Sequence, residues 1–335
     1  AFITSESDSR VEIMVTRGLG ATGAILVDYE VRGGGNLSDQ QIGGVTHYRR
    51  LPEGDEYPDT IQRNFVQGVK ASAGDDFGIE TPNQKRLCFL DVETTGKDRS
   101  GDEIIEIALK TILFELESCS IVSITDTYES YNEPTIPIKK EAFLVNRITD
   151  EMVKGKSIDW NQVNSIIEKA DVIVAHNASF DRAFIDGNSS VSPRKIWACS
   201  LEDIDWPGRS FSNGKQELLC FWHGFYYDSH RAMNDVNALI HLVTHPHYTE
   251  GHPILELIEN SGEPYYKMKA IRSPFEKKDT LKANNYKWDG GNKYWWKKLN
   301  FDEIETEKAW LTEVIYDDYF PGVVEEIPLT DKYKQ

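Results

Sequence analysis

The sequence predicts an α/β protein built on a mixed β-sheet flanked by helices. Three apolar, strand-like segments follow one another between residues 87 and 130, and strand and helix patterns then alternate up to residue 247. The chain has 335 residues, of which 39% are hydrophobic, so it can form at least one core and is long enough for two or three domains. We also expect a small α+β module at the C-terminus and a β-rich region at the N-terminus.

Residues 1–86 are expected to be strands and loops. RVEIMV and GAILVDYEV predict a hairpin pair, and the Gly-, Ser- and Asp-rich stretch over residues 70–85 predicts a linker. The role of this region is left open, since docking a protein partner and packing on the next domain are both compatible with it.

Residues 87–247 are expected to form the second domain. LCFLDVE and DVIVA are short apolar runs typical of buried strands, with EIIEIALKTILFEL and SIVSITDTYES as further strands between them. Thr149 and Asp159 are expected to cap two helices. Three more helices are predicted within NASFDRAFID, KQELLCFWHG and NDVNALIHLV.

Cysteine usage and the N-terminus indicate the compartment. The four cysteines are scattered and form no CxxC pair, which fits free thiols in a reducing cytoplasm. The first residues, AFITSESDSR, contain no basic segment followed by an apolar one, so no secretory signal is expected. No stretch approaches the roughly 18 consecutive apolar residues of a membrane span, and we expect no membrane association.

Four acidic residues lie beside four separate apolar elements. Asp91 and Glu93 are two residues apart on one strand, so both point to the same face, where they repel each other unless a cation lies between them. Asp181 follows the strand DVIVA, and Asp235 opens the last helix. Hard divalent cations prefer oxygen ligands, so these carboxylates predict a metal site.

His230 is five residues before Asp235, a spacing that would not place both on one helix face. We therefore expect it on the preceding loop, where an imidazole suits proton transfer near neutral pH. Each of these residues alone has a simpler explanation, as a solvated strand end, a capping residue or a helix-start charge. The order and context of the motifs favour a functional site.

Five segments resemble those of the DEDDh (DnaQ-like) 3′–5′ exonucleases, which include the proofreading subunit of bacterial replicative DNA polymerase. They are FLDVETTG, EIIEIAL, ITDEMVKG, VIVAHNASFDRAFI and HRAMNDVNAL. WACSLEDIDW and FYYDSHRAMNDVNAL are similar to a narrower bacterial subgroup. The resemblance covers residues 87–245 and implies a ribonuclease H-like fold. All five family-defining positions are present, at Asp91, Glu93, Asp181, His230 and Asp235.

The resemblance implies hydrolysis of phosphodiester bonds from the 3′ end of single-stranded nucleic acid, with DNA favoured and DNA repair as the setting. The four carboxylates would hold two divalent cations, Mg²⁺ or Mn²⁺, and His230 would take a proton from the attacking water. The substrate end would be held by Thr94, Thr95, Gly96, Asn177 and Phe180. A homodimer is also left open.

Two other interpretations remain. The chain could be another enzyme, a phosphatase or a nuclease of RNA, small oligonucleotides or signalling nucleotides, since reading the 2′-hydroxyl depends on pocket geometry. It could also be a non-catalytic binding protein on a nuclease scaffold.

The C-terminal module, residues 264–335, contains a basic segment within an acidic chain. The whole chain has a net charge of −18, yet residues 266–300 contain 10 basic and 3 acidic residues, a net charge of +7. Aromatic residues alternate with these lysines, a pattern that indicates single-strand capture, although a tryptophan hairpin around DGGN would also form a small core. A similar module is attached to some bacterial exonucleases. The candidate binding residues are Lys282, Tyr286, Trp288, Trp295, Trp296 and Lys297.

Two weaker signals are not assigned a function. The GxGxxG pattern over residues 18–23 precedes a strand-like segment, whereas a dinucleotide site needs a helix there. His241, His245, His247 and His252 crowd the end of the last helix, and we interpret them as a surface cluster because Pro246 interrupts the helix.

Overall fold

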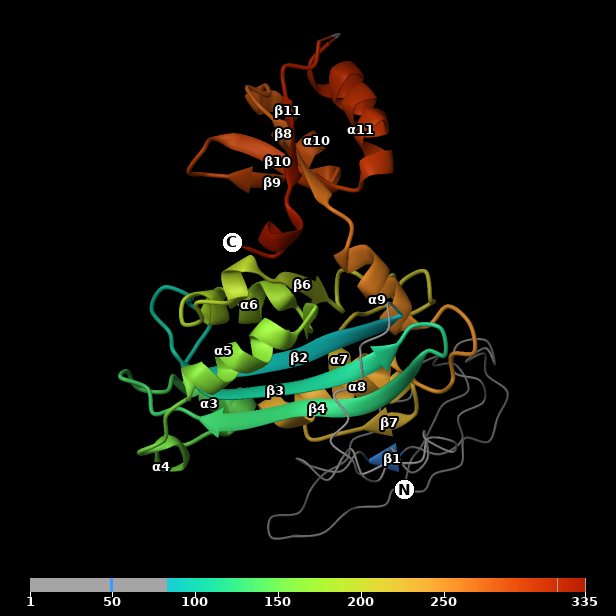
Figure 1. Ribbon diagram of the computed structural model, residues 1–335. Coiled ribbons are helices and arrows are strands. Elements are labelled where there is room, and N and C mark those ends of the chain that lie inside the picture. The colour runs from blue at the N-terminus through green and yellow to red at the C-terminus, as the bar shows by residue number, and fades with distance from the viewer. Residues whose placement is uncertain (1–48, 51–82, 318, 335) are drawn as a thin grey trace, which may run out of the picture.

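The computed structural model describes residues 49–50, 83–317 and 319–334, and its largest element is a five-stranded mixed sheet (Figure 1). The strand order is β4-β3-β2-β5-β6, in which β2, β3 and β4 are antiparallel and β5 and β6 run parallel to β2. The predicted mixed sheet flanked by helices is confirmed. The strands are β2 (Gln84–Thr94), β3 (Ile104–Glu115), β4 (Ser120–Tyr131), β5 (Val172–Ala175) and β6 (Ile196–Cys199).

Apolar side chains of β2 point alternately to the two faces of the sheet, and helices pack against them on both faces. Leu87 and Phe89 pack with α8, while Leu90 and Val92 pack with α5 and α6 on the other face. The predicted caps are present: Thr149 accepts a hydrogen bond from Met152 N. The helices around the sheet are α3 (Lys140–Asn146), α4 (Asp150–Val153), α5 (Trp160–Lys169), α6 (Ala178–Asp186), η2 (Ser192–Arg194), α7 (Gln216–Trp222) and α8 (Ala232–Val243).

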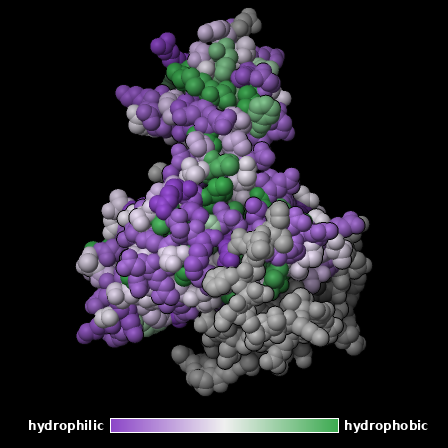
Figure 2. All heavy atoms as spheres, viewed as in Figure 1, coloured by the Kyte–Doolittle hydropathy of each residue, from purple (hydrophilic) through white to green (hydrophobic). Residues whose placement is uncertain are grey.

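A second sheet forms the C-terminal module. The helix α9 (Pro253–Ser261) joins this module across a narrow waist to the five-stranded sheet and its surrounding helices, which we call the larger body (Figure 2). Its antiparallel order is β11-β8-β10-β9, and Trp295 lies opposite Trp288, so the predicted tryptophan hairpin is confirmed. The elements are β8 (Tyr265–Ala270), η3 (Phe275–Lys277), α10 (Lys278–Ala283), β9 (Lys287–Asp289), β10 (Tyr294–Leu299), η4 (Phe301–Glu303), α11 (Ile304–Trp310), η5 (Leu311–Ile315), β11 (Val323–Ile327) and η6 (Leu329–Asp331).

Most of the N-terminal region lies outside the described residues, including the expected hairpin and the GxGxxG pattern. Within it, β1 (Arg49–Arg50) pairs in parallel with β7 (Phe225–Tyr226). The prediction of a linker over residues 70–85 is wrong for its last two residues, because Gln84 and Lys85 already pair with β3 in the sheet. The domain limits at 86, 247 and 264 remain predictions.

The expected surface cluster of histidines at the end of α8 is only partly correct, because His247 is exposed whereas His241 and His245 are packed against aromatic rings. His241 is 8% exposed, and its ring lies 4.6 Å from that of Phe225. His245 packs between His223 and Phe225, and burial lowers its pKa to about 2. The end of α8 is therefore covered by β7 and α7, which the sequence pattern does not reveal.

Two further expectations concern the described part of the chain. Cys88, Cys119, Cys199 and Cys220 are free thiols. No helix among the described residues is both long and apolar enough to pass through a bilayer.

The C-terminal segment turns back from the module and is anchored on the larger body. Arg182 on α6 is fully buried and donates hydrogen bonds of 2.6 Å to the carbonyl oxygens of Thr330 and Lys332. The Lys332 ammonium in turn donates to the carbonyl oxygens of Asn260 (2.6 Å) and Glu263 (3.1 Å). Because both cations are buried, these bonds hold the module against the body.

We expect Lys332→Ala to lower the free energy of unfolding by about 3 kcal/mol, because it leaves buried carbonyl oxygens without a donor. Lys334→Ala is the matched control, since Lys334 pairs only with Asp331 at the surface and should change stability by less than about 0.5 kcal/mol. Urea denaturation measures both variants. Equal stability of the two would show that the anchor contributes nothing.

Candidate active site

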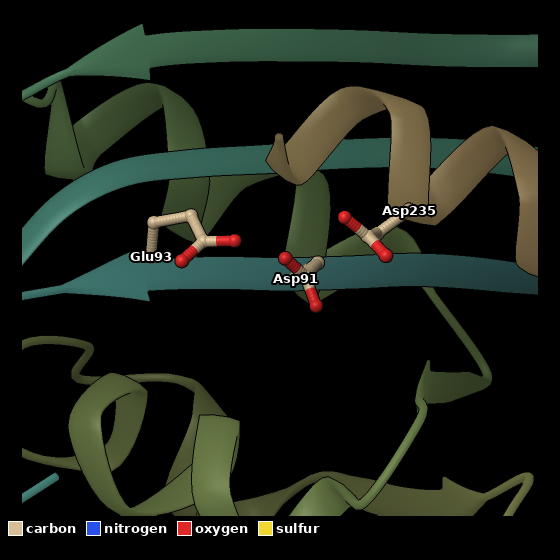
Figure 3. A group of neighbouring side chains, drawn as sticks. All are labelled: Asp91, Glu93 and Asp235. Carbon is tan, nitrogen blue, oxygen red and sulfur yellow. The ribbon is translucent and has the colours of Figure 1, made fainter. Parts of the chain in front are cut away.

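Three carboxylates converge at the end of β2. Asp91 and Glu93 extend the face of β2 that begins with Leu87 and Phe89, and Asp235 reaches them from the first turn of α8. Each offers an oxygen atom, and these atoms all lie within 4.8 Å of one another (Figure 3). A register shift between Glu93 and Thr94 ends the regular pairing with β3 at this point.

Asp181 approaches the same place from the opposite face of the sheet. It lies on the first turn of α6, is 2% exposed, and accepts a hydrogen bond of 3.1 Å from the Val92 backbone N–H. Its charge is one of those that raise the pKa of Asp91. The structure thus brings together the four acidic residues that the sequence singled out.

Burial and mutual repulsion disfavour the ionised form of all four carboxyl groups. The pKa values of Asp91 and Asp181 are raised well above their usual range, chiefly because burial removes water from the charged form. For the same reason the pKa of Glu93 is raised to about 7 and that of Asp235 to about 6. A negatively charged cluster of this kind attracts cations.

The partners of these carboxylates do not cancel their charge. Asp235 accepts hydrogen bonds from the Tyr227 hydroxyl (2.8 Å) and from the backbone N–H groups of His230 (2.8 Å) and Arg231 (3.1 Å). Among the described residues, no lysine or arginine forms an ion pair with any of the four acids. Oxygen donors without a protein cation suit a hard divalent metal, so the residues present fit the expected cofactor.

His230 lies on the loop before α8, as predicted, in a left-handed backbone conformation with φ of 64°. Its Nε2 is 3.3 Å from Oε1 of Glu217, and both side chains are 43% exposed. Hydrogen bonding to Glu217 raises the pKa of His230, with further contributions from Asp235 and Glu93. The imidazole is therefore at the edge of the cluster and accessible to solvent.

Glu106 is a part of the site that the sequence analysis missed. It lies on β3 directly opposite Glu93, is 1% exposed, and pairs with Arg231 at 2.8 Å. This pair cancels the charge of the fifth acid and fixes the residue that precedes α8. A glutamate inside the apolar run IIEIAL was the available signal. No sequence pattern pointed to Glu217, because its contact with His230 is created by the tertiary packing.

Thr94 is the last residue of β2, and Thr95 and Gly96 follow it. The Thr95 side chain is fully buried and donates to Oδ1 of Asp102 at 2.9 Å, which fixes the chain after the strand. A Cβ on Gly96 would lie 2.4 Å from Oδ2 of Asp102, which explains the glycine. Thr94 donates to the Gly96 carbonyl at 2.6 Å. Their expected role in substrate binding remains a prediction.

Asn177 and Phe180 flank Asp181 at the start of α6. Asn177 caps the helix with φ of 63° and is exposed, while the half-buried ring of Phe180 lies 5.1 Å from that of Phe184. Both precede Asp181 in the sequence, and their contact with a nucleotide remains a prediction.

The six candidate residues of the C-terminal module do not share one surface. Tyr286 is 4% exposed and Trp295 is 9% exposed, so both are core residues and unavailable for stacking on bases. Lys297 pairs with Glu307 at 2.7 Å. Trp288 and Lys282 are exposed, whereas Trp296 points to the other face of β10 because it alternates with Trp295 and Lys297.

Comparison with known proteins identifies the segment that carries the site. Residues 88–243 match the exonuclease family model. The chain is 27% identical over 200 residues to a PolC-type DNA polymerase III of Caldanaerobacter subterraneus, covering 54% of this chain and 14% of that protein. It is 30% identical over 147 residues to the DNA polymerase III subunit epsilon of Buchnera aphidicola, covering 41% of this chain and 60% of that protein.

The matched segment spans only a part of the relatives. A PolC-type DNA polymerase III of Listeria monocytogenes is 33% identical over 134 residues, which are 36% of this chain and 8% of that protein. A solved structure of exonuclease X in complex with 5′ overhanging duplex DNA has a TM-score of 0.36 and 23% sequence identity, and the match covers 51% of this chain and 99% of that one. The family match contains all four clustered carboxylates and His230, so the part of the chain that carries the site is the part that is similar to exonucleases.

Proposed function

We propose that the chain is a metal-dependent exonuclease that removes nucleoside 5′-monophosphates from the 3′ end of single-stranded DNA. The observation that carries the proposal is the convergence of Asp91, Glu93 and Asp235, with Asp181 beside them and without an ion pair to any lysine or arginine of the described residues. The similarity of residues 88–243 to exonucleases supports the reaction class. The direction of degradation from the 3′ end, the single-stranded DNA substrate and the identity of the cations belong to the proposal.

Asp91, Glu93, Asp181 and Asp235 would hold two divalent cations, Mg²⁺ or Mn²⁺. When bound, such cations supply positive charge that offsets the developing charge on the phosphate and on the leaving oxygen. Hydrogen bonds from Tyr227 and from the backbone keep Asp235 in its orientation, and the Val92 N–H does the same for Asp181. The protein thus arranges the oxygen donors before any cation binds.

His230 would act as the general base. A water oxygen forms a new bond to phosphorus, the bond from phosphorus to the 3′ oxygen of the preceding nucleotide breaks, and the water proton passes to His230 Nε2. The leaving 3′ oxygen takes a proton from solvent. Glu217 Oε1 lies 3.3 Å from the same Nε2 and accepts its hydrogen bond, so it orients the imidazole, and the His230 ring has to turn away from Glu217 before this nitrogen can take the water proton.

A substrate panel tests the proposal. The full chain with Mn²⁺ should shorten a 5′-labelled single strand one nucleotide at a time, and chelator should stop the reaction. RNA, blunt duplex DNA and dinucleotides are the comparison substrates. Cleavage of dinucleotides or RNA alone would establish a different nuclease, and binding without cleavage of any substrate would overturn the enzyme assignment.

Asp91→Ala should lower turnover by at least about 10³-fold, because it removes the central oxygen donor of the cluster. Asp150→Ala is the control, since Asp150 is exposed on α4 and should leave turnover unchanged. Single-turnover assays on the labelled strand measure both. Full activity of Asp91→Ala would place the reaction elsewhere.

His230→Ala should lower turnover by about 10²–10⁴-fold, the usual contribution of a general base. Glu217→Ala should have a smaller effect of about 10-fold, because it alters only the orientation of the imidazole. His252→Ala, at the start of α9, is the histidine control. A larger loss for Glu217→Ala than for His230→Ala would contradict the assigned roles.

Metal binding can be measured without activity. Mn²⁺ should raise the melting temperature of the wild-type chain, since a ligand at 100 times its Kd stabilises the folded state by about 2.7 kcal/mol. Asp91→Asn should abolish this shift and, in chelator at pH 8, melt above the wild type, because it removes one of the mutually repelling charges. An undiminished Mn²⁺ shift in Asp91→Asn would place the metal outside the cluster.

A further inference from the structure

The sheet of the C-terminal module has one covered face and one open face. Met268 and Ala270 of β8 and Trp295 and Leu299 of β10 point inwards and pack with residues of α10, α11 and η5. The alternate residues of the same strands point away from this core. Figure 1 shows α11 standing to one side of the sheet.

The open face contains a compact set of aromatic rings and lysines. Trp296 lies opposite Lys269 of β8 and Lys287 of β9, while Tyr294 precedes Trp296 by two residues on the same face. The Lys267 ammonium is 4.6 Å from the centre of the Trp296 ring and 5.7 Å from that of Tyr294. Lys269 is 5.4 Å from the Tyr294 ring and Lys287 is 5.5 Å from the Trp296 ring. We call these five residues the open sheet face.

Internal pairing accounts for only a part of this charge. Lys269 forms an ion pair of 2.5 Å with Glu325. Hydrogen bonds from Asn292 lower the pKa of the nearby Asp289, and the charge of Lys267 contributes to a smaller extent. Within the described part of the chain, no carboxylate forms an ion pair with Lys267 or Lys287. Exposed cation–π contacts are weak, so these lysines can leave the rings for a stronger partner.

The charge and the spacing identify the class of that partner. The open sheet face belongs to the segment of net charge +7 in a chain of net charge −18, so a polyanion is attracted here and repelled by most of the remaining surface. Tyr294 and Trp296 are about 7 Å apart along the strand, which matches two successive unstacked bases. A duplex would not expose its bases to these rings.

We propose that the open sheet face is a second, non-catalytic binding site for single-stranded DNA. Tyr294 and Trp296 stack on bases, and Lys267, Lys269 and Lys287 exchange their ring contacts for contacts with phosphates. The site replaces the set expected from the sequence, of which only Trp296 remains. It does not depend on the proposed cleavage reaction, because it requires neither the carboxylates nor a metal.

The experiment measures binding of the full chain, in chelator, to a fluorescent oligothymidylate of about 20 nucleotides. Trp296→Ala should weaken binding by roughly 5- to 100-fold, the range for loss of one stacked base. Trp288→Ala is the matched control, since this tryptophan is 52% exposed but lies on the other face of the hairpin, and it should change binding by less than about 2-fold. Trp296→Phe should restore much of the affinity, which separates stacking from misfolding.

The salt dependence provides an independent measurement. The double variant Lys267→Ala/Lys287→Ala should reduce the slope of log Kd against log salt by about 1.4, which corresponds to two phosphate contacts on a single strand. Lys277→Ala/Lys282→Ala, which removes the same charge from η3 and α10, should leave the slope nearly unchanged. Wild-type affinity in Trp296→Ala, a larger loss in Trp288→Ala, or equal binding of blunt duplex would overturn the proposal. Binding with this variant pattern but without cleavage would instead refute only the proposed function.

Discussion

The main constraint on the larger body is that four carboxylates, which repel one another, are buried close together at the end of β2. Burial raises the pKa values of Asp91, Glu93, Asp181 and Asp235, and repulsion by neighbouring carboxylates adds to the rise at Asp91, Glu93 and Asp181. Such an arrangement is unfavourable by itself. It persists because the apolar residues of β2 and α8, which lead directly into the cluster, hold its members in place.

The acidic residues near the end of β2 fall into two groups, which differ in whether their charge is neutralised by a cationic side chain. Glu106 is neutralised by Arg231, and its position is thereby fixed beside the site. Two of the four clustered acids, Asp181 and Asp235, accept hydrogen bonds from backbone N–H groups, and Asp235 also accepts one from a tyrosine; these bonds orient them without cancelling their charge. The contrast distinguishes a structural ion pair from a group of oxygen donors that attracts cations.

The C-terminal module and the larger body are joined at two points. One is the helix α9, and the other is the returning segment whose carbonyl oxygens are bound by Arg182, next to Asp181 in the sequence. Removal of the whole module would also expose Arg182, so a deletion would alter the stability of the protein as well as its binding of DNA. Point variants on the open sheet face change DNA binding without exposing Arg182.

The sequence by itself determined the strands β2 to β5, the caps at Thr149 and Asp159, and the residues of the carboxylate cluster. Local patterns suffice there, because alternation on β2 places Asp91 and Glu93 on one face and the motifs lie at the ends of apolar elements. Only the tertiary structure decided which neighbours surround them. Glu217 and Glu106 are distant in sequence from the residues that they contact, as is Arg182 from the C-terminal segment. The same holds for the module, because strand pairing and helix packing decide which aromatic residues enter the core and which remain on the open sheet face.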